Sequence, residues 1–266
     1  MGSEPSALER ILRRDRLTVI GGLIFVSLTS WLWILTGAGT DMGEMASTQG
    51  GATLTMRLAW TPAYFALMLA MWWAMMVAMM LPSAAPMVLL FAVVNRKSRK
   101  QGRPYVPTGF FVAGYLVAWG GFSLVAVLLQ WGLERLSLLS PLMHVTSLYL
   151  GAALLIGAGV YHLTPLKHAC LRHCRSPIDF IARYWRQGTG GAFRMGLQHG
   201  LFCLGCCWVL MVLLFYVGVM NLWWIVGLAL YVLLEKLGPA GHRLGRYTGG
   251  LLILWGSWVL VRAITG

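Results

Sequence analysis

The chain has 266 residues, of which 58% are hydrophobic and only 11% are charged, and its mean hydropathy is +0.71. Soluble domains usually carry about 25% charged residues, so this composition excludes an ordinary soluble enzyme or binding domain. The net charge of +13 is typical either of nucleic-acid binding or of a membrane protein with basic loops.

Long apolar segments predict an all-α, polytopic transmembrane helical bundle with about seven spans. A membrane helix needs about 20 mostly apolar residues, and a helix satisfies its own backbone hydrogen bonds in lipid. The predicted spans are residues 17–36, 62–92, 108–131, 145–166, 196–219, 221–237 and 247–263. We expect a basic cytoplasmic segment over residues 1–16, without a cleavable signal peptide, and one transmembrane helical domain over residues 17–266.

The basic residues alternate between the predicted loops. On the side of the N-terminus lie 18 of the 21 Lys and Arg residues, and the other side has Arg57, Arg135 and Arg262. The positive-inside bias therefore predicts a cytoplasmic N-terminus in a multi-pass protein of the bacterial inner (plasma) membrane. The lipid bilayer, with its anionic headgroups, is then a sufficient partner for this charge, and we expect no binding of nucleic acid.

The first predicted external loop contains two carboxylates and two thioethers within five residues. They are Asp41, Met42, Glu44 and Met45. Such groups are able to receive a cation from outside, but the same residues are also ordinary in a solvated loop. Both interpretations remain open.

The second predicted span ends in the stretch MWWAMMVAMMLPSAAPM, residues 71–87. Thioethers are soft ligands that suit Cu(I), although methionine is also an adaptable apolar residue in protein cores. Pro82 and Pro86 lack the backbone N–H of a helix, so we expect the helix to break here and to free carbonyl groups. The candidate metal ligands are Met75, Met76, Met79 and Met80.

Two further clusters combine cysteine with histidine. At the predicted inner mouth, the stretch HACLRHC places Cys170 and Cys174 on one face if it is helical. In a reducing cytoplasm these thiols are expected to stay free. Each cysteine alone is equally compatible with apolar packing, and the hypothesis of a metal site depends on all five cysteines lying in two such clusters.

The second cluster is HGLFCLGCCW, near the start of the fifth predicted span. His199, Cys203 and Cys206 lie within about 60° of one another on a helix, and Cys207 lies further round. Imidazole, thiolate and thioether together form a soft-metal ligand set. At about 1.5 Å per residue, the cysteines and the methionines of the second span lie at similar depths. The sequence therefore predicts a metal site that these two spans share.

Glu235 is the one acidic residue inside the predicted spans, and Lys236 follows it. Acidic residues inside a membrane are candidates for function. Near the inner end of a span, however, long charged side chains also extend to the membrane surface. The sequence leaves these two interpretations open.

Several stretches closely resemble a bacterial family described as predicted metal-binding integral membrane proteins, a domain of unknown function. The resemblance covers roughly residues 60–240 and implies a polytopic inner-membrane protein with a metal-linked role. It is carried by AMMLPSAAPM (78–87), LTPLKHACLRHCRSP (163–177), HGLFCLGCCWVLM (199–211), GVMNLWW (218–224) and LEKL (234–237). In that family glutamine is common where this chain has His162, which makes His162 a weaker ligand candidate.

The leading hypothesis is a membrane protein that binds a soft metal ion, most simply Cu(I), and transfers or transports it, with a metal donor or acceptor protein as partner. An alternative is a metal- or thiol-dependent membrane oxidoreductase that uses Cys206 and Cys207, and a further one is a structural subunit of a membrane complex. Walker and dinucleotide-binding motifs are absent, so pumping by ATP within this chain is not expected. The sequence decides neither catalysis nor oligomeric state.

Overall fold

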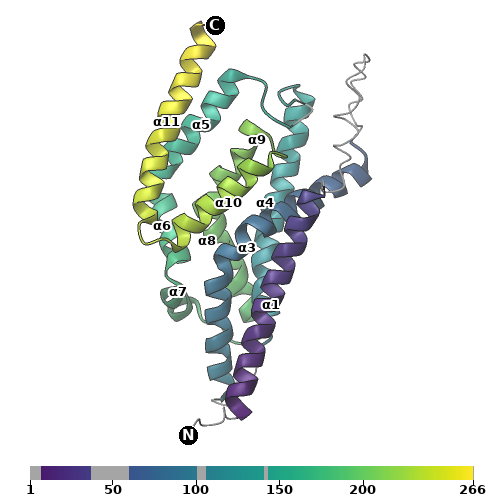
Figure 1. Cartoon of the computed structure of the whole chain (residues 1–266), viewed down its shortest axis with the longest axis vertical. Helices are drawn as coiled ribbons and strands as arrows, with labels where there is room; N and C mark the ends of the chain where they lie inside the picture. Colours follow the sequence, from purple (N-terminus) through teal and green to yellow (C-terminus); the bar gives the residue numbers. More distant parts are fainter. Residues whose placement is uncertain (1–6, 37–59, 101–105, 141–142, 266) are drawn as a thin grey trace.

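A computed structural model describes residues 7–36, 60–100, 106–140 and 143–265 (Figure 1). Throughout this part of the chain the structure is all-α, as predicted, and the only strand-like pairing is an isolated bridge between Leu139 and Val145. The helices are α1 (Ala7–Leu35), α3 (Pro62–Lys100), α4 (Gly109–Arg135), α5 (Leu148–Leu163), α6 (Pro165–Arg175), α7 (Pro177–Tyr184), α8 (Gly188–Val212), α9 (Leu214–Val217), α10 (Leu222–Leu237) and α11 (Gly241–Thr265).

Five of the described helical segments are long and apolar enough to cross a membrane, and the bent pair α5–α6 adds a sixth if it counts as one span. The predicted spans 145–166 and 221–237 correspond to α5 and α10, which have 16 residues each. A helix of this length is about 24 Å long, shorter than the roughly 30 Å hydrocarbon core of a bilayer. The count of seven spans and the cytoplasmic N-terminus therefore remain predictions.

The predicted break at Pro82 and Pro86 is wrong. Helix α3 runs through both prolines for 39 residues, and Figure 1 shows it bent between its first and second halves. Proline bends a helix without ending it when neighbouring groups supply hydrogen bonds. The carbonyls that lose a helical partner are those of Ala78 and Pro82, four residues before each proline. Between them, the Met80 carbonyl accepts additional hydrogen bonds from the Ser83 hydroxyl (2.8 Å) and from the Tyr115 hydroxyl of α4 (3.2 Å).

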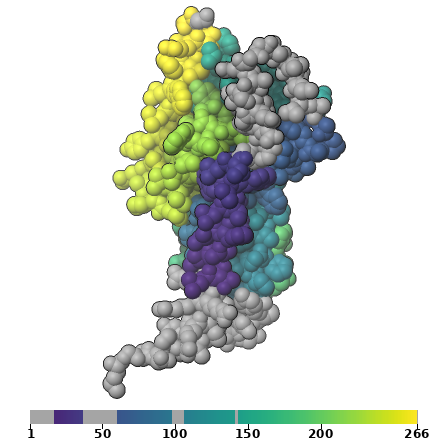
Figure 2. Space-filling view, turned by 45° about the vertical axis from the view of Figure 1, so that its right-hand side comes forward, coloured from purple at the N-terminus to yellow at the C-terminus, as the bar shows by residue number. Residues whose placement is uncertain are grey.

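Small residues bring α8 close to α4. A Cβ atom added at Gly196 would lie 1.9 Å from the carbonyl oxygen of Phe111, so only glycine permits this backbone contact. Helices α5 and α11 form a second close pair, and α1 packs along α3. Helix α1 is otherwise peripheral, and Figure 2 shows it lying on the surface of the molecule.

The chain turns by 64° between α5 and α6. Pro165 begins α6, and proline disfavours the helical region for the residue before it. Thr164 is accordingly extended, with ψ 148°. The Thr164 hydroxyl then accepts a hydrogen bond from the Lys167 amide and caps the new helix. The bend directs α6 across α8, against which it packs.

Candidate metal site

Helix α8 supplies the centre of the site. The thiols of Cys203, Cys206 and Cys207 are all buried with 1% of their surface exposed. Successive positions on a helix point in different directions, so each thiol meets a different neighbouring helix. The three contacts together join α3, α4, α6 and α10 around α8.

Cys203 lies between a phenol and an ammonium group. Its sulfur is 3.1 Å from the hydroxyl of Tyr115 on α4, and Lys236 of α10 donates to it from 2.9 Å. Lys236 also donates to the Ser83 hydroxyl of α3 at 3.1 Å. An ammonium group this close stabilises negative charge on sulfur, and thiolate is the form of cysteine that binds metals.

The other two thiols meet sulfur atoms from elsewhere in the chain. Cys206 Sγ lies 4.0 Å from Cys174 Sγ of α6, and Cys207 Sγ lies 3.7 Å from Met80 Sδ of α3. Both thiols also donate to the Cys203 carbonyl, at 3.0 and 2.9 Å. The predicted convergence of sulfur from the second and fifth spans is therefore present. The resulting sulfur cluster consists of Met80, Cys174, Cys203, Cys206 and Cys207.

Four other predicted ligands lie in, or pack against, the same core. Met75, Met76 and Met79 belong to the core that contains the three α8 thiols. Cys170 is partly buried and lies over Gly205, where an added Cβ would be 2.7 Å from its sulfur. The remaining predicted ligands, Asp41 and Met42 with their neighbours Glu44 and Met45, lie outside the described residues.

His199 occupies an aromatic pocket beside the sulfur cluster. Its ring centroid lies 5.3 Å from that of Phe180, 5.9 Å from Tyr115 and 6.1 Å from Phe111. Its Nδ1 is buried, and no described residue hydrogen-bonds to it. Buried polar atoms are nearly always paired, so this nitrogen is an available donor atom close to the thiols.

Glu235 and Lys236 do not extend to a membrane surface, because both are buried, with 1% and 5% exposed. The helical spacing of apolar residues in this span could have predicted the burial of Glu235. Apart from Lys236, the buried residues of α10 are Ile225, Leu228, Val232 and Glu235, a spacing of three and four that marks one helix face. Applied to residues 221–237, that period places the acid inward, and Lys236 on the adjoining face contacts Cys203.

Buried charges anchor α6 to α10. Lys167 of α6 forms a salt bridge with Glu235 at 2.7 Å, and it also donates to the ring of His162 at 2.7 Å. Arg175 donates to the carbonyl of Glu235 at 2.6 Å and to that of Gly238 at 2.7 Å. These contacts fix α6 where Cys174 faces Cys206 and fix α10 where Lys236 faces Cys203.

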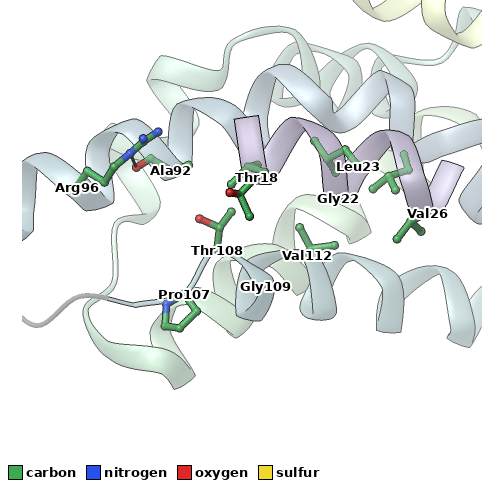
Figure 3. Close-up of a pocket in the computed structure, with 12 residues that line it drawn as sticks. Thr18, Gly22, Leu23, Val26, Ala92, Arg96, Pro107, Thr108, Gly109 and Val112 are labelled. Atoms are coloured by element: carbon green, nitrogen blue, oxygen red, sulfur yellow. Dashed lines mark hydrogen bonds between the residues drawn. The ribbon is translucent and has the colours of Figure 1, made fainter. Parts of the chain in front are cut away.

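A separate pocket of about 370 Å³ lies between α1, α3 and the start of α4 (Figure 3). Thr18, Arg96 and Thr108 are its polar or charged lining residues, and the rest of the lining is apolar. No cysteine, histidine or methionine lines it. The pocket is therefore distinct from the sulfur cluster.

The sulfur contacts match the requirements of an ion that binds few ligands. Two sulfur atoms that each bind one ion at about 2.3 Å, the Zn–S length, are at most roughly 4.6 Å apart. The pairs at 3.7 and 4.0 Å lie within this limit. Among the described residues, no group of three or more His, Cys, Asp or Glu side chains is arranged to hold a metal. The separations of the two sulfur pairs are therefore compatible with one ion bound between two sulfur atoms.

Comparison with known proteins gives one match. A family model described as copper chaperone, PpoB2, matches residues 69–259. This range contains the whole sulfur cluster. The chain matches no curated protein and no solved structure at a significant level.

Proposed function

Because the chain belongs to the PpoB2 copper chaperone family, we propose that it binds Cu(I) in the sulfur cluster, within a membrane, and transfers the ion to an acceptor protein. The observation that carries the proposal is the meeting of sulfur atoms from three helices. Cys206 faces Cys174 at 4.0 Å and Cys207 faces Met80 at 3.7 Å, in the buried core.

The chemistry of these ligands favours Cu(I) over harder ions. Thiolate and thioether are the soft ligands that select Cu(I). Lys236 supplies a positive charge 2.9 Å from Cys203 Sγ, which offsets the cost of burying a thiolate. Cys206 and Cys207 now donate their thiol protons to the Cys203 carbonyl. To bind Cu(I) as thiolates they would release these protons to the solvent, so the affinity for copper would fall at low pH. His199, with its unpaired buried Nδ1, is an additional ligand in this proposal.

Transfer requires weaker sites on either side of the cluster. Met75, Met76 and Met79 lie in the same core as the thiols, and stacked thioethers suit an ion that must leave each site. Asp41 and Met42 are the proposed external entry, and Cys170 is the proposed exit ligand beside Cys174. In this scheme the protein lies in the bacterial inner membrane and takes Cu(I) from a donor or passes it to an acceptor.

Copper binding to the full-length protein in detergent tests the proposal. The protein is loaded with Cu(I) under anaerobic, reducing conditions, and its affinity is measured by competition with a chromophoric chelator. Cys206→Ser and Cys207→Ser should each weaken binding by about 10–100-fold, the range for perturbed metal sites. Met87→Leu, on the same helix as Met80 but in a second core, should bind as the parent does.

Cys170→Ser separates binding from transfer. It should retain the tightly bound ion but release it more slowly to an acceptor chelator. If the double variant Cys206→Ser/Cys207→Ser binds as much copper as the parent, with equal affinity, the sulfur cluster is not the site.

Thiol–disulfide chemistry is a second candidate, because Cys174 and Cys206 approach within 4.0 Å. This pair, rather than Cys206 with Cys207, is the one whose sulfur atoms face each other. Oxidation of a dithiol to a disulfide removes two protons and two electrons, which an added thiol–disulfide couple accepts. A loss of two free thiols, abolished by Cys174→Ser, would favour this function.

A further inference from the structure

A second group of sulfur atoms meets around the side chain of Gln130 on α4. Gln130 is fully buried, and its Oε1 accepts a hydrogen bond from Trp72 Nε1 at 2.9 Å. Because an indole nitrogen only donates, this bond fixes which way the amide points. Its NH₂ group therefore faces Met68 and Met143, whose sulfur atoms are each 3.7 Å from Nε2.

The NH₂ group of Gln130 has more hydrogen-bond acceptors around it than it has hydrogen atoms to donate. Glu134 Oε1, one helical turn from Gln130, is also an acceptor for Nε2, at 2.9 Å. Two thioethers and one carboxylate oxygen thus surround a nitrogen that has two hydrogen atoms. The acceptors come from α3, α4 and the turn between α4 and α5, so three separate parts of the chain direct their lone pairs to one place.

The backbone at Met143 is held in an unfavourable conformation to make this contact. Its φ is 57°, in the left-handed region that bulky residues seldom adopt. The turn is fixed by the Met143 amide donating to the Ser140 carbonyl at 2.9 Å and the Val145 amide donating to the Phe215 carbonyl at 2.8 Å. Strain of this kind persists where surrounding structure imposes it, often at binding sites. Here it directs the methionine inward, with 8% of its surface exposed.

The charge at this place is also suited to a cation. The Glu134 carboxylate accepts from two neutral donors, Trp60 Nε1 at 2.8 Å and Gln130 Nε2. Among the residues that the structure describes, Lys167–Glu235 is the only salt bridge, so Glu134 has no Lys or Arg partner there. A partly buried carboxylate is stabilised by a positive charge, and one monovalent cation leaves the group neutral.

We infer that Met68, Met143 and Glu134 form a second binding site for a soft monovalent cation. The ion binds where the Gln130 amide nitrogen now lies, so the Gln130 side chain turns away and gives up its hydrogen bond with Trp72. Thioethers select the soft Cu(I) ion, and Glu134 balances its charge. The ligand set does not depend on the sulfur cluster, but delivery from one site to the other rests on the proposed function. Along α3, Met68 and Met80 are 12 residues and about 18 Å apart, with buried methionines between them.

Titration of the full-length protein in detergent with chelator-buffered Cu(I) tests this site. We expect two classes of bound ion. Met68→Leu and Met143→Leu, which nearly conserve volume, should each weaken only the second class by about 10-fold or more. Met87→Leu, the matched control on α3, should change neither class.

Glu134→Gln keeps the shape of the side chain and its acceptor for Trp60 while removing the charge, so it tests the site even if a methionine variant folds poorly. Glu134→Gln should weaken binding of the second class of ion about as much as the methionine variants do. X-ray absorption at the copper edge of a Cys206→Ser/Cys207→Ser protein should report thioether sulfur and one oxygen.

The two proposals fail in different ways. A single class of ion that disappears with the cysteines, or a second class unchanged by all three variants at the Gln130 site, overturns this inference and leaves the proposed function standing. A second class that is lost in Met68→Leu while the cysteine variants have no effect overturns the sulfur cluster instead.

Discussion

At the scale of single residues, the surroundings of Cys203 differ from those of the other two α8 thiols. Its sulfur contacts Lys236 and Tyr115, whereas the sulfur atoms of Cys206 and Cys207 contact other sulfur atoms and the Cys203 carbonyl. A buried ammonium group is costly unless it is paired. Lys236 therefore makes Cys203 the position where a negative charge is most readily accommodated.

Replacing Lys236 by leucine tests this role. Lys236→Leu removes the charge without adding a sulfur ligand, so a thiolate at Cys203 loses its cationic partner. We expect the affinity for Cu(I) to fall by about 10–100-fold, measured by chelator competition. Lys236→Arg retains the charge and should retain more of the affinity, and equal affinity in parent and Lys236→Leu would contradict the role.

The sequence identified the thiols of the sulfur cluster and Met80, because sulfur-rich ligand sets are rare and chemically specific. It did not identify Tyr115 or Ser83, since a tyrosine and a serine on apolar helices carry no metal-binding signature. For Lys236 the sequence left two interpretations open, a functional role inside the membrane or a side chain that extends to the membrane surface. Which helix each thiol faces is set by tertiary packing, which no local pattern in the sequence records.

At the scale of helices, the site depends on close packing of α8 against α4. Tyr115 reaches Cys203 only because the two backbones nearly touch, and Gly196 is one of the contact points, against the Phe111 carbonyl. Any side chain at this position forces the helices apart. Cys203 would then move away from Tyr115, its partner on α4.

Gly196→Ala should destabilise the protein by about 1–3 kcal/mol or more, the cost of overpacking a core. Its added Cβ would lie 1.9 Å from the Phe111 carbonyl oxygen. Thermal unfolding of the protein in detergent measures the effect. Gly121→Ala is the control on α4, because an added Cβ there meets nothing within 4 Å and alanine is the better helix former. Equal stability of the two variants would show that the α4–α8 contact is looser than described.

The helices themselves were largely predictable, since long apolar segments specify them directly. The proline stretch was not predictable, because a local rule about missing N–H groups predicts a break. Each proline removes only one helical hydrogen bond, and α3 continues through both. The bend at Thr164 had its signal in the Thr-Pro pair. Its consequence, the placement of Cys174 against Cys206, depends on buried charges of α6 and α10 that are far apart in the sequence.

At the scale of the whole molecule, the start of α1 and the end of α11 lie at opposite ends of the bundle (Figure 1). This arrangement agrees with an odd number of crossings, as the distribution of Lys and Arg predicts. Many large apolar side chains are exposed on its surface, including Phe25, Leu128, Trp223 and Leu254. Exposed apolar side chains in this number favour a lipid or protein environment.

Reporter fusions test the orientation. At the N-terminus, a reporter that works only in the cytoplasm should be active. At the C-terminus, a reporter that works only outside the cytoplasm should be active, because 18 of 21 basic residues fall on the predicted inner side. Both reporters on the same side would mean an even number of crossings. In that case α5 or α10 does not cross the membrane.

Helix α3 is a single structural part that serves both proposed sites. It carries Met68 near its start and Met80 beyond its middle, so any rotation about its axis turns both thioethers in the same sense. Coupling between two binding sites is reciprocal. If an ion bound at one site rotates α3 and changes the affinity of the other site, an ion at the second site changes the affinity of the first by the same factor. Pro82 and Pro86 both follow Met80 in the sequence. The segment of α3 between Met68 and Met80 therefore contains no proline and stays stiff.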